Sequence, residues 1–326
     1  MSKAVKVKKD KRPGVGGGGG GSEGGFRNFT VEATGLHTAV AEAQTEFNKS
    51  FYLGNLETVV LSTKLEKKNV QTIIEQLMRD ETADKLAVLT CTDQSAEEIL
   101  SISSATPPAS VIETTVSSTM HQQGLVPRMH LWEFWRNAEM IGTYPYAPLV
   151  TKDGENIKLT GTEVFANYAP TTKLGSLENL FYNFMAHKVR HISMTVPNGD
   201  QTFEVRFAKS TNHLSVRMND GVATLHDDVQ VRAELSSDED RGESPVSDQE
   251  LARYERVMAD YIKSQSTALL RQLKDKGTDI CGFGRVYVLS NPSTAEAMRN
   301  QWKTLFEHGE PDIQVTVHMT RQGSLI

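Results

Sequence analysis

Apolar side chains recur every three or four residues between Ser247 and Lys276, and this period predicts one long helix. Ser247 and Glu250 have the spacing of a capping box at its beginning. Gly277 can end it in the left-handed conformation. At about 1.5 Å per residue the helix would be roughly 40 Å long, so it needs a broad surface to pack against. Its apolar side consists of Leu251, Tyr254, Met258, Tyr261, Ile262, Leu269 and Leu273.

After residue 191 the apolar period changes to two, which predicts strands. Asn198-Gly199 and Asn219-Asp220-Gly221 have the composition of hairpin turns. We therefore expect an antiparallel sheet that packs against the long helix. The alternating segments are 192–196, 203–207, 214–218 and 229–235. Beyond the long helix we expect a strand at 285–289, a helix at 293–306 and a strand at 313–319.

Short apolar runs alternate with amphipathic segments in the first 107 residues. Asn69 and Ser95 are candidate caps for two of the predicted helices. This alternation predicts an α/β domain with at least partly parallel strands. The expected strands are 26–31, 59–61 and 86–91, and the expected helices are 36–48, a segment from Asn69 to Met78, and 96–101.

The centre of the chain is interrupted by Pro107-Pro108 and a Ser/Thr-rich stretch to Thr119. A helix at 130–141, a rigid aromatic loop at 144–148 and two strands around Asp153-Gly154 should follow. A helix at 177–188 then leads into the last domain. The predicted class is therefore α/β and α+β with several domains. These are an N-terminal α/β domain at 1–107, a small middle domain or connector at 108–172, and a C-terminal domain at 173–326, in which an antiparallel sheet packs with the long helix at 248–276.

The beginning of the chain predicts little chemistry. Val5 and Val7 alternate with lysines, as in a short edge strand. Glycines at 16–21 match a phosphate-binding pattern trivially, but no Lys-Ser/Thr pair follows to lead into a helix. We therefore expect a flexible loop there.

The composition of the chain excludes several classes of protein. The 326 residues are 38% hydrophobic and 23% charged, as in a globular protein. A net charge of −6 argues against a dedicated nucleic-acid binder. Two cysteines exclude a disulfide-rich scaffold. No apolar run approaches the roughly 18 residues of a membrane span, and the charged first residues do not match a secretory signal, so we expect a soluble chain.

Candidate chemistry is sparse. His187 and His191 have the i, i+4 spacing of zinc ligands, but cations lie between them and the glutamate of a metalloprotease motif is missing. Cys91 and Cys281 have no activating neighbours. Asp227 and Asp228 should point to opposite faces of a strand, so they are a poor acid/base pair. Asp279 should close a turn through backbone amides. We therefore expect no catalytic residue, no cofactor and no metal site.

An aromatic cluster is the remaining candidate for a functional surface. Trp132 and Trp135 lie on one predicted helix, and Tyr144 and Tyr146 follow in the aromatic loop. Aromatic side chains at helical spacing usually lie in a core. They are also enriched at protein interfaces, so these four residues are a candidate partner surface.

The order of landmarks in the C-terminal half resembles a known family. The long helix is followed by Asp279 and Gly282-Phe283-Gly284, then by Trp302 and Phe306. The alternating strand and Arg321-Gln322-Gly323 come last. This set resembles the C subunits of bacterial spore germinant receptors, the Ger(x)C lipoprotein family. Matching segments in the N-terminal half are Gly35-Leu36 with Ala39 and Ala43, 51–56 (with Asn55 where histidine is common), 59–62, 78–80, 86–89, 96–100, 142–148 and 159–165.

The resemblance implies a non-enzymatic, three-domain protein. It would be tethered by a lipidated cysteine, of the palmitate-carrying kind, to the outer face of the spore inner membrane. It would act with the integral membrane A and B subunits of the receptor in the response to nutrient germinants. This sequence has no signal peptide and no lipobox cysteine before Val5, which a trimmed chain would explain.

Two other functions remain open from the sequence. One is an enzyme with an unrecognised site, for example a hydrolase that uses His226 or Asp227. The other is a binder of a small nutrient, which predicts an amino-acid-sized cleft between domains. A deep pocket with paired titratable groups would favour the enzyme, whereas a continuous solvent-facing sheet would count against it.

Overall fold

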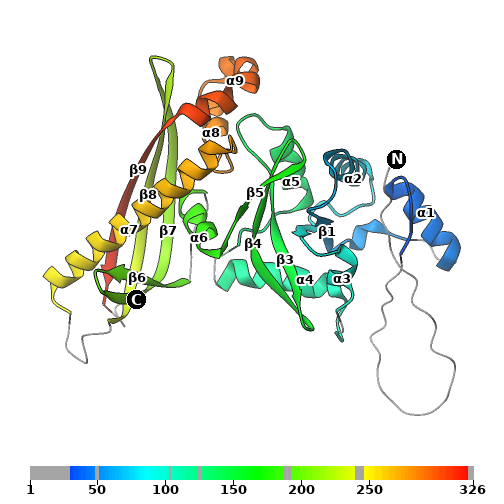
Figure 1. The fold of residues 1–326 in the computed structure, drawn as a ribbon, viewed down its shortest axis with the longest axis horizontal. Coiled ribbons are helices and arrows are strands. Elements are labelled where there is room, and N and C mark those ends of the chain that lie inside the picture. The colour runs from blue at the N-terminus through cyan, green and yellow to red at the C-terminus, as the bar shows by residue number, and fades with distance from the viewer. Residues whose placement is uncertain are drawn as a thin grey trace, which may run out of the picture.

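Two β-sheets, joined by one buried helix, organise the computed structural model (Figure 1). The structure describes residues 30–47, 51–102, 104–122, 126–186, 189, 192–238 and 246–321. The strand expected at 5–7 and the glycine run at 16–21 lie outside these residues, as does most of the strand expected at 26–31.

The first sheet is mixed. Its strand order follows the chain, with β1, β2 and β3 parallel and β3, β4 and β5 antiparallel. The expectation of partly parallel strands is therefore confirmed. Gly154 has a φ of 61° in the predicted turn between β3 and β4. The strands are β1 (Thr58–Ser62), β2 (Val88–Thr92), β3 (Tyr146–Asp153), β4 (Asn156–Ala166) and β5 (Ala169–Leu174).

Helices cover both faces of this sheet. Val88 packs with α3 and α4, whereas Leu89, its neighbour on β2, packs in the cluster that contains α2 and α5. Successive strand residues point to opposite faces, so the two helix pairs lie on opposite sides. Ser95 caps α3, as predicted, and it forms a capping box with Glu98. The helices are α1 (Leu36–Phe47), α2 (Lys67–Arg79), α3 (Ala96–Leu100), α4 (Pro108–Gln122) and α5 (Leu131–Glu139), and a short 3₁₀ turn, η1, spans Leu53–Asn55.

Two expectations for this half are wrong, and one stretch for which no element was predicted forms a helix. The Ser/Thr-rich stretch is the helix α4, because Pro108 suits a first helical turn and Ile112 and Val116 supply a buried side. The aromatic loop at 144–148 becomes strand β3 from Tyr146 onwards. Asn69 lies inside α2, which begins at Lys67.

The second sheet has the order β6-β7-β8-β9. β6, β7 and β8 are antiparallel, as expected, and they turn at Gly199 and Asp220-Gly221, where φ is positive. β9 pairs parallel to β8, so the sheet is mixed and not fully antiparallel. The helices between β8 and β9 provide the crossover that a parallel pair requires. The strands are β6 (Ile192–Asn198), β7 (Gln201–Asn219), β8 (Val222–Asp238) and β9 (Glu310–Thr320).

The segments 203–207 and 214–218, predicted as separate strands, belong to the single strand β7. A register shift between Phe207 and Lys209 disturbs the pairing without ending it. Such an irregularity breaks the apolar alternation in the sequence, so one strand is read there as two.

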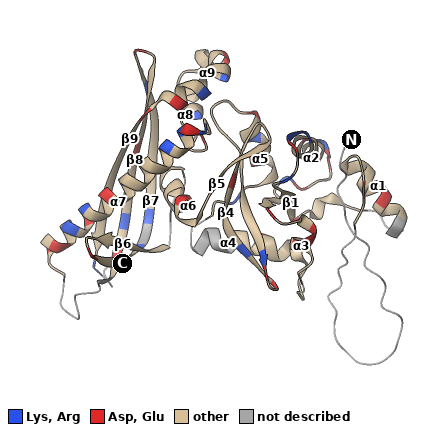
Figure 2. Cartoon of the chain, viewed as in Figure 1, with Lys and Arg blue, Asp and Glu red and all other residues tan. Residues whose placement is uncertain are grey.

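The long helix α7 (Asp248–Asp275) is confirmed, with the predicted capping box of Ser247 and Glu250. Its buried side lies against α6, β6, β9 and α9. Acidic and basic residues are both distributed along this helix (Figure 2). The buried side chains are Tyr254, Met258, Ile262, Ser266, Leu269, Leu270 and Leu273.

The strand expected at 285–289 is wrong, because these residues form the helix α8 (Phe283–Ser290). The Asp279 carboxylate accepts bonds from the amides of Gly282, Phe283 and Gly284, which otherwise lack helical partners. Asp279 therefore closes a turn, as predicted, and this turn starts a helix. The 3₁₀ turn η2 (Pro292–Thr294) and helix α9 (Ala295–His308) follow.

Helix α6 (Ser176–Ala186) joins the two halves. Seven consecutive residues from Asn179 to Met185 are buried, so this helix has no solvent-facing side along that stretch. It contacts β4 and β5 of the first sheet and β7, β8 and α7 of the second unit. Strands from both of the first two expected domains share one sheet. The division at 107 and 172 stays a prediction.

Candidate functional site

A cleft of about 490 Å³ lies between the two halves of the molecule. Its walls come from the segment 126–129, α5, α6, the loop after α7, and α8, with Leu214 of β7 and Thr143 and Tyr146 near the start of β3. Since no single element supplies the site, its shape depends on how the two halves pack.

Close backbone contact holds α8 in place beside this cleft. The Arg285 amide donates a hydrogen bond to the Gly142 carbonyl at 3.0 Å. A Cβ atom on Gly284 would collide with the Trp302 ring and the Gly142 backbone. Only a residue without a side chain permits this approach, which explains the glycine after Phe283.

Asp279 is the buried anchor of the same turn. Its Oδ1 accepts from Gly282 N at 2.8 Å and its Oδ2 from Gly284 N at 2.8 Å. Trp302 Nε1 also donates to Oδ2, at 3.0 Å. Burial raises the pKa of Asp279 to about 6, and these hydrogen bonds oppose the rise. The carboxylate is saturated with donors, so it acts as a structural cap.

Two tyrosines form an inner wall of the cleft. The Tyr146 and Tyr182 rings meet edge to face with centroids 5.6 Å apart. Tyr182 Oη donates to the Ile280 carbonyl at 3.2 Å. Burial raises the pKa of both phenols above the ordinary value, so both stay protonated at neutral pH.

Three arginines line the cleft: Arg128, Arg136 and Arg285. One carboxylate, Glu133, is also in the lining, and its Oε2 accepts the His130 amide in a helix cap. Within the described part of the chain, the side chains of Arg128 and Arg285 form no ion pair or hydrogen bond. The charge of the lining is therefore positive.

Cys281 also lines the cleft, but its thiol is unreactive. Burial, followed by the nearby Asp279 and Asp227 charges, raises its pKa well above the ordinary value. A thiol that stays protonated is a poor nucleophile. Cys91 is buried as well, and its pKa is raised in the same way. The raised pKa values agree with the expectation that neither cysteine is activated, which stays a prediction.

The possible hydrolase residues do not converge. Asp227 is fully buried, and its Oδ1 accepts from Asn212 Nδ2 at 3.2 Å. Burial raises its pKa to about 8, although the Asn212 bond lowers it. His226, the adjacent strand residue, faces the other side, where its Nδ1 lies 2.7 Å from Asp312 Oδ2. Asp227 and His226 therefore do not form an acid/base pair.

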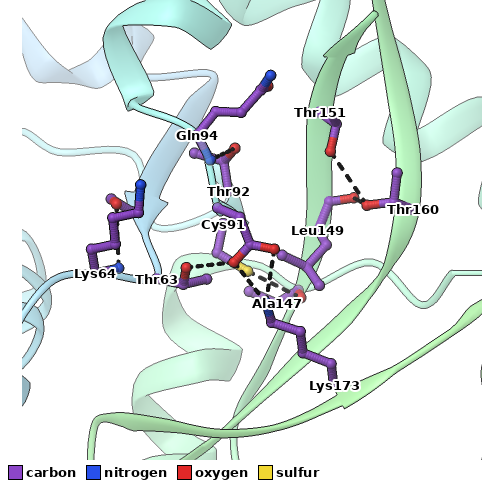
Figure 3. A network of polar contacts seen from close by, with 12 residues as sticks. Thr63, Lys64, Cys91, Thr92, Gln94, Ala147, Leu149, Thr151, Thr160 and Lys173 are labelled. Carbon is purple, nitrogen blue, oxygen red and sulfur yellow. Dashed lines mark hydrogen bonds and ion pairs between the residues drawn. The ribbon is translucent and has the colours of Figure 1, made fainter.

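A second polar network lies where β1 and β2 end, which is a common ligand position in α/β sheets (Figure 3). Thr63 Oγ1 and Lys173 Nζ both donate to Asp93 Oδ1 at 2.7 Å. Thr63 follows β1 and Lys173 lies on β5, so one carboxylate joins both edges of the sheet. Both ionic groups are about half exposed, which makes this network a surface tie.

Glu163 lies behind this network on β4. It is 2% exposed, and its Oε2 accepts no hydrogen bond from the described residues. Burial raises its pKa to about 7, while the Lys173 charge opposes the rise. Glu163 therefore stays partly protonated near neutral pH, and the pKa of the neighbouring Cys91 thiol is itself raised by burial.

The four residues of the predicted aromatic surface differ in their exposure to solvent. Trp135 is 39% exposed, whereas Tyr146 is buried in the cleft wall. Trp132 is half-buried under the Arg136 guanidinium, which lies 4.8 Å from its ring centroid. Tyr144 is half-buried, and burial raises its pKa to about 12. A partner role for the four residues stays a prediction.

His187 and His191 lie outside the described residues. Across the described ranges, no group of three or more His, Cys, Asp or Glu side chains is placed to hold a metal ion. In the same ranges, no helix combines the length and apolar character that a membrane span requires.

Comparison with known families identifies the class of protein. Residues 7–152 match a family model described as the spore germination protein N-terminal domain. Residues 160–323 match a second model, described as spore germination B3/GerAC like, C-terminal. The chain therefore belongs to the GerAC-like family of spore germination proteins, which is not known for enzymes, and the resemblance seen in its sequence is confirmed.

Individual relatives agree with this assignment. The chain is 20% identical to the spore germination protein GerQC of Bacillus cereus over 309 residues, which cover 92% of this chain and 84% of the relative. Its fold is similar to the crystal structure of the GerBC protein, with a TM-score of 0.63 and 13% identity. That similarity covers 86% of this chain and 84% of the other. The mixed fold with a long helix is thus shared.

Proposed function

We propose that this protein is a non-catalytic accessory subunit of a membrane-bound nutrient germinant receptor, acting through contacts with the integral membrane A and B subunits. The observation that supports it is the extent of the family match, which includes both halves of the chain. A function shared with germination proteins therefore involves the whole architecture, and not one module within it.

The aromatic residues of α5 offer one contact surface for such a partner. Trp135 exposes 39% of its area, and Arg136 stacks on Trp132 beside it. Tryptophan and arginine carry large shares of binding energy at protein interfaces. Tyr144 would extend this surface, whereas the buried Tyr146 would support it from beneath.

Co-purification tests this proposal. The protein is expressed from its complete gene with an affinity tag, and spore inner membranes are dissolved in mild detergent. Recovery of both integral subunits with the tagged protein is expected. Recovery of neither, while the tagged protein remains folded, would contradict the proposal.

A pair of variants tests the contact surface. Trp135→Ser should reduce recovery of the integral subunits, since a buried interfacial tryptophan commonly contributes 2 kcal/mol or more, or about 30-fold in affinity. Tyr52→Ser is the matched control, because it removes another exposed aromatic side chain, 66% exposed, far from α5 in the chain. Equal loss in both variants would argue against an interface at α5.

Membrane attachment at the outer face of the inner membrane belongs to the same proposal. A covalent lipid on a cysteine encoded upstream would supply it, together with contacts to the integral subunits. Metabolic labelling with an alkyne fatty acid should then mark the protein made from the complete gene. An unlabelled protein that leaves the membrane in high salt would exclude the lipid anchor.

A further inference from the structure

The cleft between the two halves brings arginine side chains together with apolar and aromatic residues. Arg128 comes from the segment before α5, Arg136 from α5 and Arg285 from α8. Arg285 is far from the other two arginines in the sequence, so the fold alone brings it beside them. With Glu133 engaged in the cap of α5, cationic side chains dominate the lining.

Arg136 is already held in position. Its Nε and Nη2 donate to Asn137 Oδ1 at 3.1 and 2.9 Å, and its guanidinium lies over Trp132. A guanidinium has five N–H donors, so three remain for a ligand. A planar group fixed in this way loses little freedom when it binds an anion, which favours carboxylate recognition.

The rest of the lining combines apolar and aromatic residues with the polar Asn137, Thr143 and Asn183. Met129, Leu214, Val286 and Leu289 contribute side chains, together with the tyrosine wall. A volume of about 490 Å³ lies within the range of small-molecule sites. An inorganic ion would leave these apolar walls in contact with water, whereas an organic anion would cover them.

We propose that this cleft binds a small organic carboxylate that carries a compact apolar or aromatic group. The arginines pair with the carboxylate, and the apolar body lies against Tyr146 and Leu214. This inference goes beyond the proposed receptor function, because it concerns a ligand of the isolated chain and no partner subunit.

Binding also links the two halves of the molecule. Arg136 belongs to the half that contains the first sheet, and Arg285 belongs to α8, which packs against β7. A carboxylate between them fixes the packing of α5 relative to α8. Amide hydrogen exchange in both helices should therefore slow when the site is filled.

The test uses benzoate as the probe and the uncharged isostere benzamide as its control. Isothermal titration calorimetry with the purified chain should show saturable one-to-one binding of benzoate, with a dissociation constant on the order of 1 mM for so small a ligand. Benzamide should bind at least about tenfold more weakly, because it cannot form a charge-assisted pair. Quenching of Trp132 fluorescence gives an independent readout.

Two arginine variants locate the site. Arg136→Gln and Arg285→Gln should each weaken benzoate binding by about tenfold. Arg299→Gln, an equal change of charge on the exposed side of α9, should leave it unchanged. Arg285 is exposed, so its variant tests the idea even if Arg136→Gln fails to fold.

Three results would overturn the proposal. One is equal affinity for benzoate and benzamide, which would remove any role for charge. Another is unaltered benzoate binding by both cleft variants. The last is the absence of saturable binding at concentrations well above 1 mM, about tenfold higher, where a site of this class would be filled.

Discussion

Leu269→Asp tests the packing of the long helix. Leu269 is 3% exposed and lies in the last quarter of α7, on the side that packs toward the second sheet. The substitution removes a buried apolar side chain and places a carboxylate in the same volume. Neither effect involves the cleft, so the change should act on stability alone.

The loss of stability expected for Leu269→Asp is the sum of two free-energy costs. Removing a buried leucine side chain costs about 2 to 5 kcal/mol. Leaving a carboxyl group among apolar side chains adds at least a few kcal/mol, whether it stays charged or takes up a proton. The sum is comparable with the roughly 5 to 15 kcal/mol that holds a typical domain together. The C-terminal half should therefore unfold, or its melting temperature should fall by more than about 10 °C.

Circular dichroism melts and urea titrations measure this effect. Ala268→Asp is the matched control, because it adds the same carboxylate one residue earlier on the exposed side of α7. The control should cost less than about 1 kcal/mol, which is the order of the change in helix propensity. A cooperative melt of Leu269→Asp at the wild-type midpoint would refute the assignment of this helix face.

Three further predictions concern other buried and exposed groups. Gly284→Ala should destabilise the protein by about 1 to 3 kcal/mol, because its new methyl group collides with Trp302, whereas Ser290→Ala at the exposed end of α8 should have little effect in the same urea titration. Asp227→Asn should raise the free energy of unfolding at pH 8. The pKa of Asp227 is raised to about 8 in the folded state, so its contribution to the stability of the wild-type protein is full below the unfolded pKa near 4, and it is lost as the pH rises toward 8. The stability gained by Asp227→Asn should therefore be smaller at pH 5 than at pH 8 in urea titrations. An equal gain at both pH values would contradict this sign. Lys173→Ala should change stability by less than about 1 kcal/mol, because both members of its ion pair are half exposed, and a larger loss would mean that the network supports the sheet.

The sequence predicted correctly the elements that are stabilised by residues close together in the chain. The cap at Ser95, the capping box at Ser247 and the hairpin turn at Gly199 stand where the sequence placed them. In each case a few neighbouring residues satisfy the backbone, so short windows contain the necessary information. The long helix belongs to the same group, since its buried side chains recur from Tyr254 to Leu273.

Tertiary contacts decided the elements that were predicted wrongly. The segment 285–289 is rich in residues that suit strands, yet it lies in α8, whose first amides are capped by Asp279. Trp302 of α9 donates a hydrogen bond to the same carboxylate. The side chain that starts this helix is thus held by a contact 23 residues away. Likewise, the parallel pairing of β9 depends on a crossover that no local pattern reveals.

The cleft had no local signature at all. Arg136 and Arg285 are isolated cations in the sequence, and their convergence depends on the contact between Gly142 and Gly284. Both glycines lie in landmarks of the family resemblance, which marked the positions without indicating their proximity. The predicted aromatic surface, in contrast, named Tyr146, which is the only one of its four members that lines this cleft.

The β3–β4 hairpin has a consequence for any attempt to divide the protein. The two family models meet between residues 152 and 160, within this hairpin, where β3 ends at Asp153 and β4 begins at Asn156. A cut in its turn would leave each piece with an uncovered strand, whose amide and carbonyl groups could pair with another molecule. We therefore expect pieces made at this boundary to aggregate. The two family segments divide the sequence, but β3 and β4 from either side of that division pair with each other in one sheet.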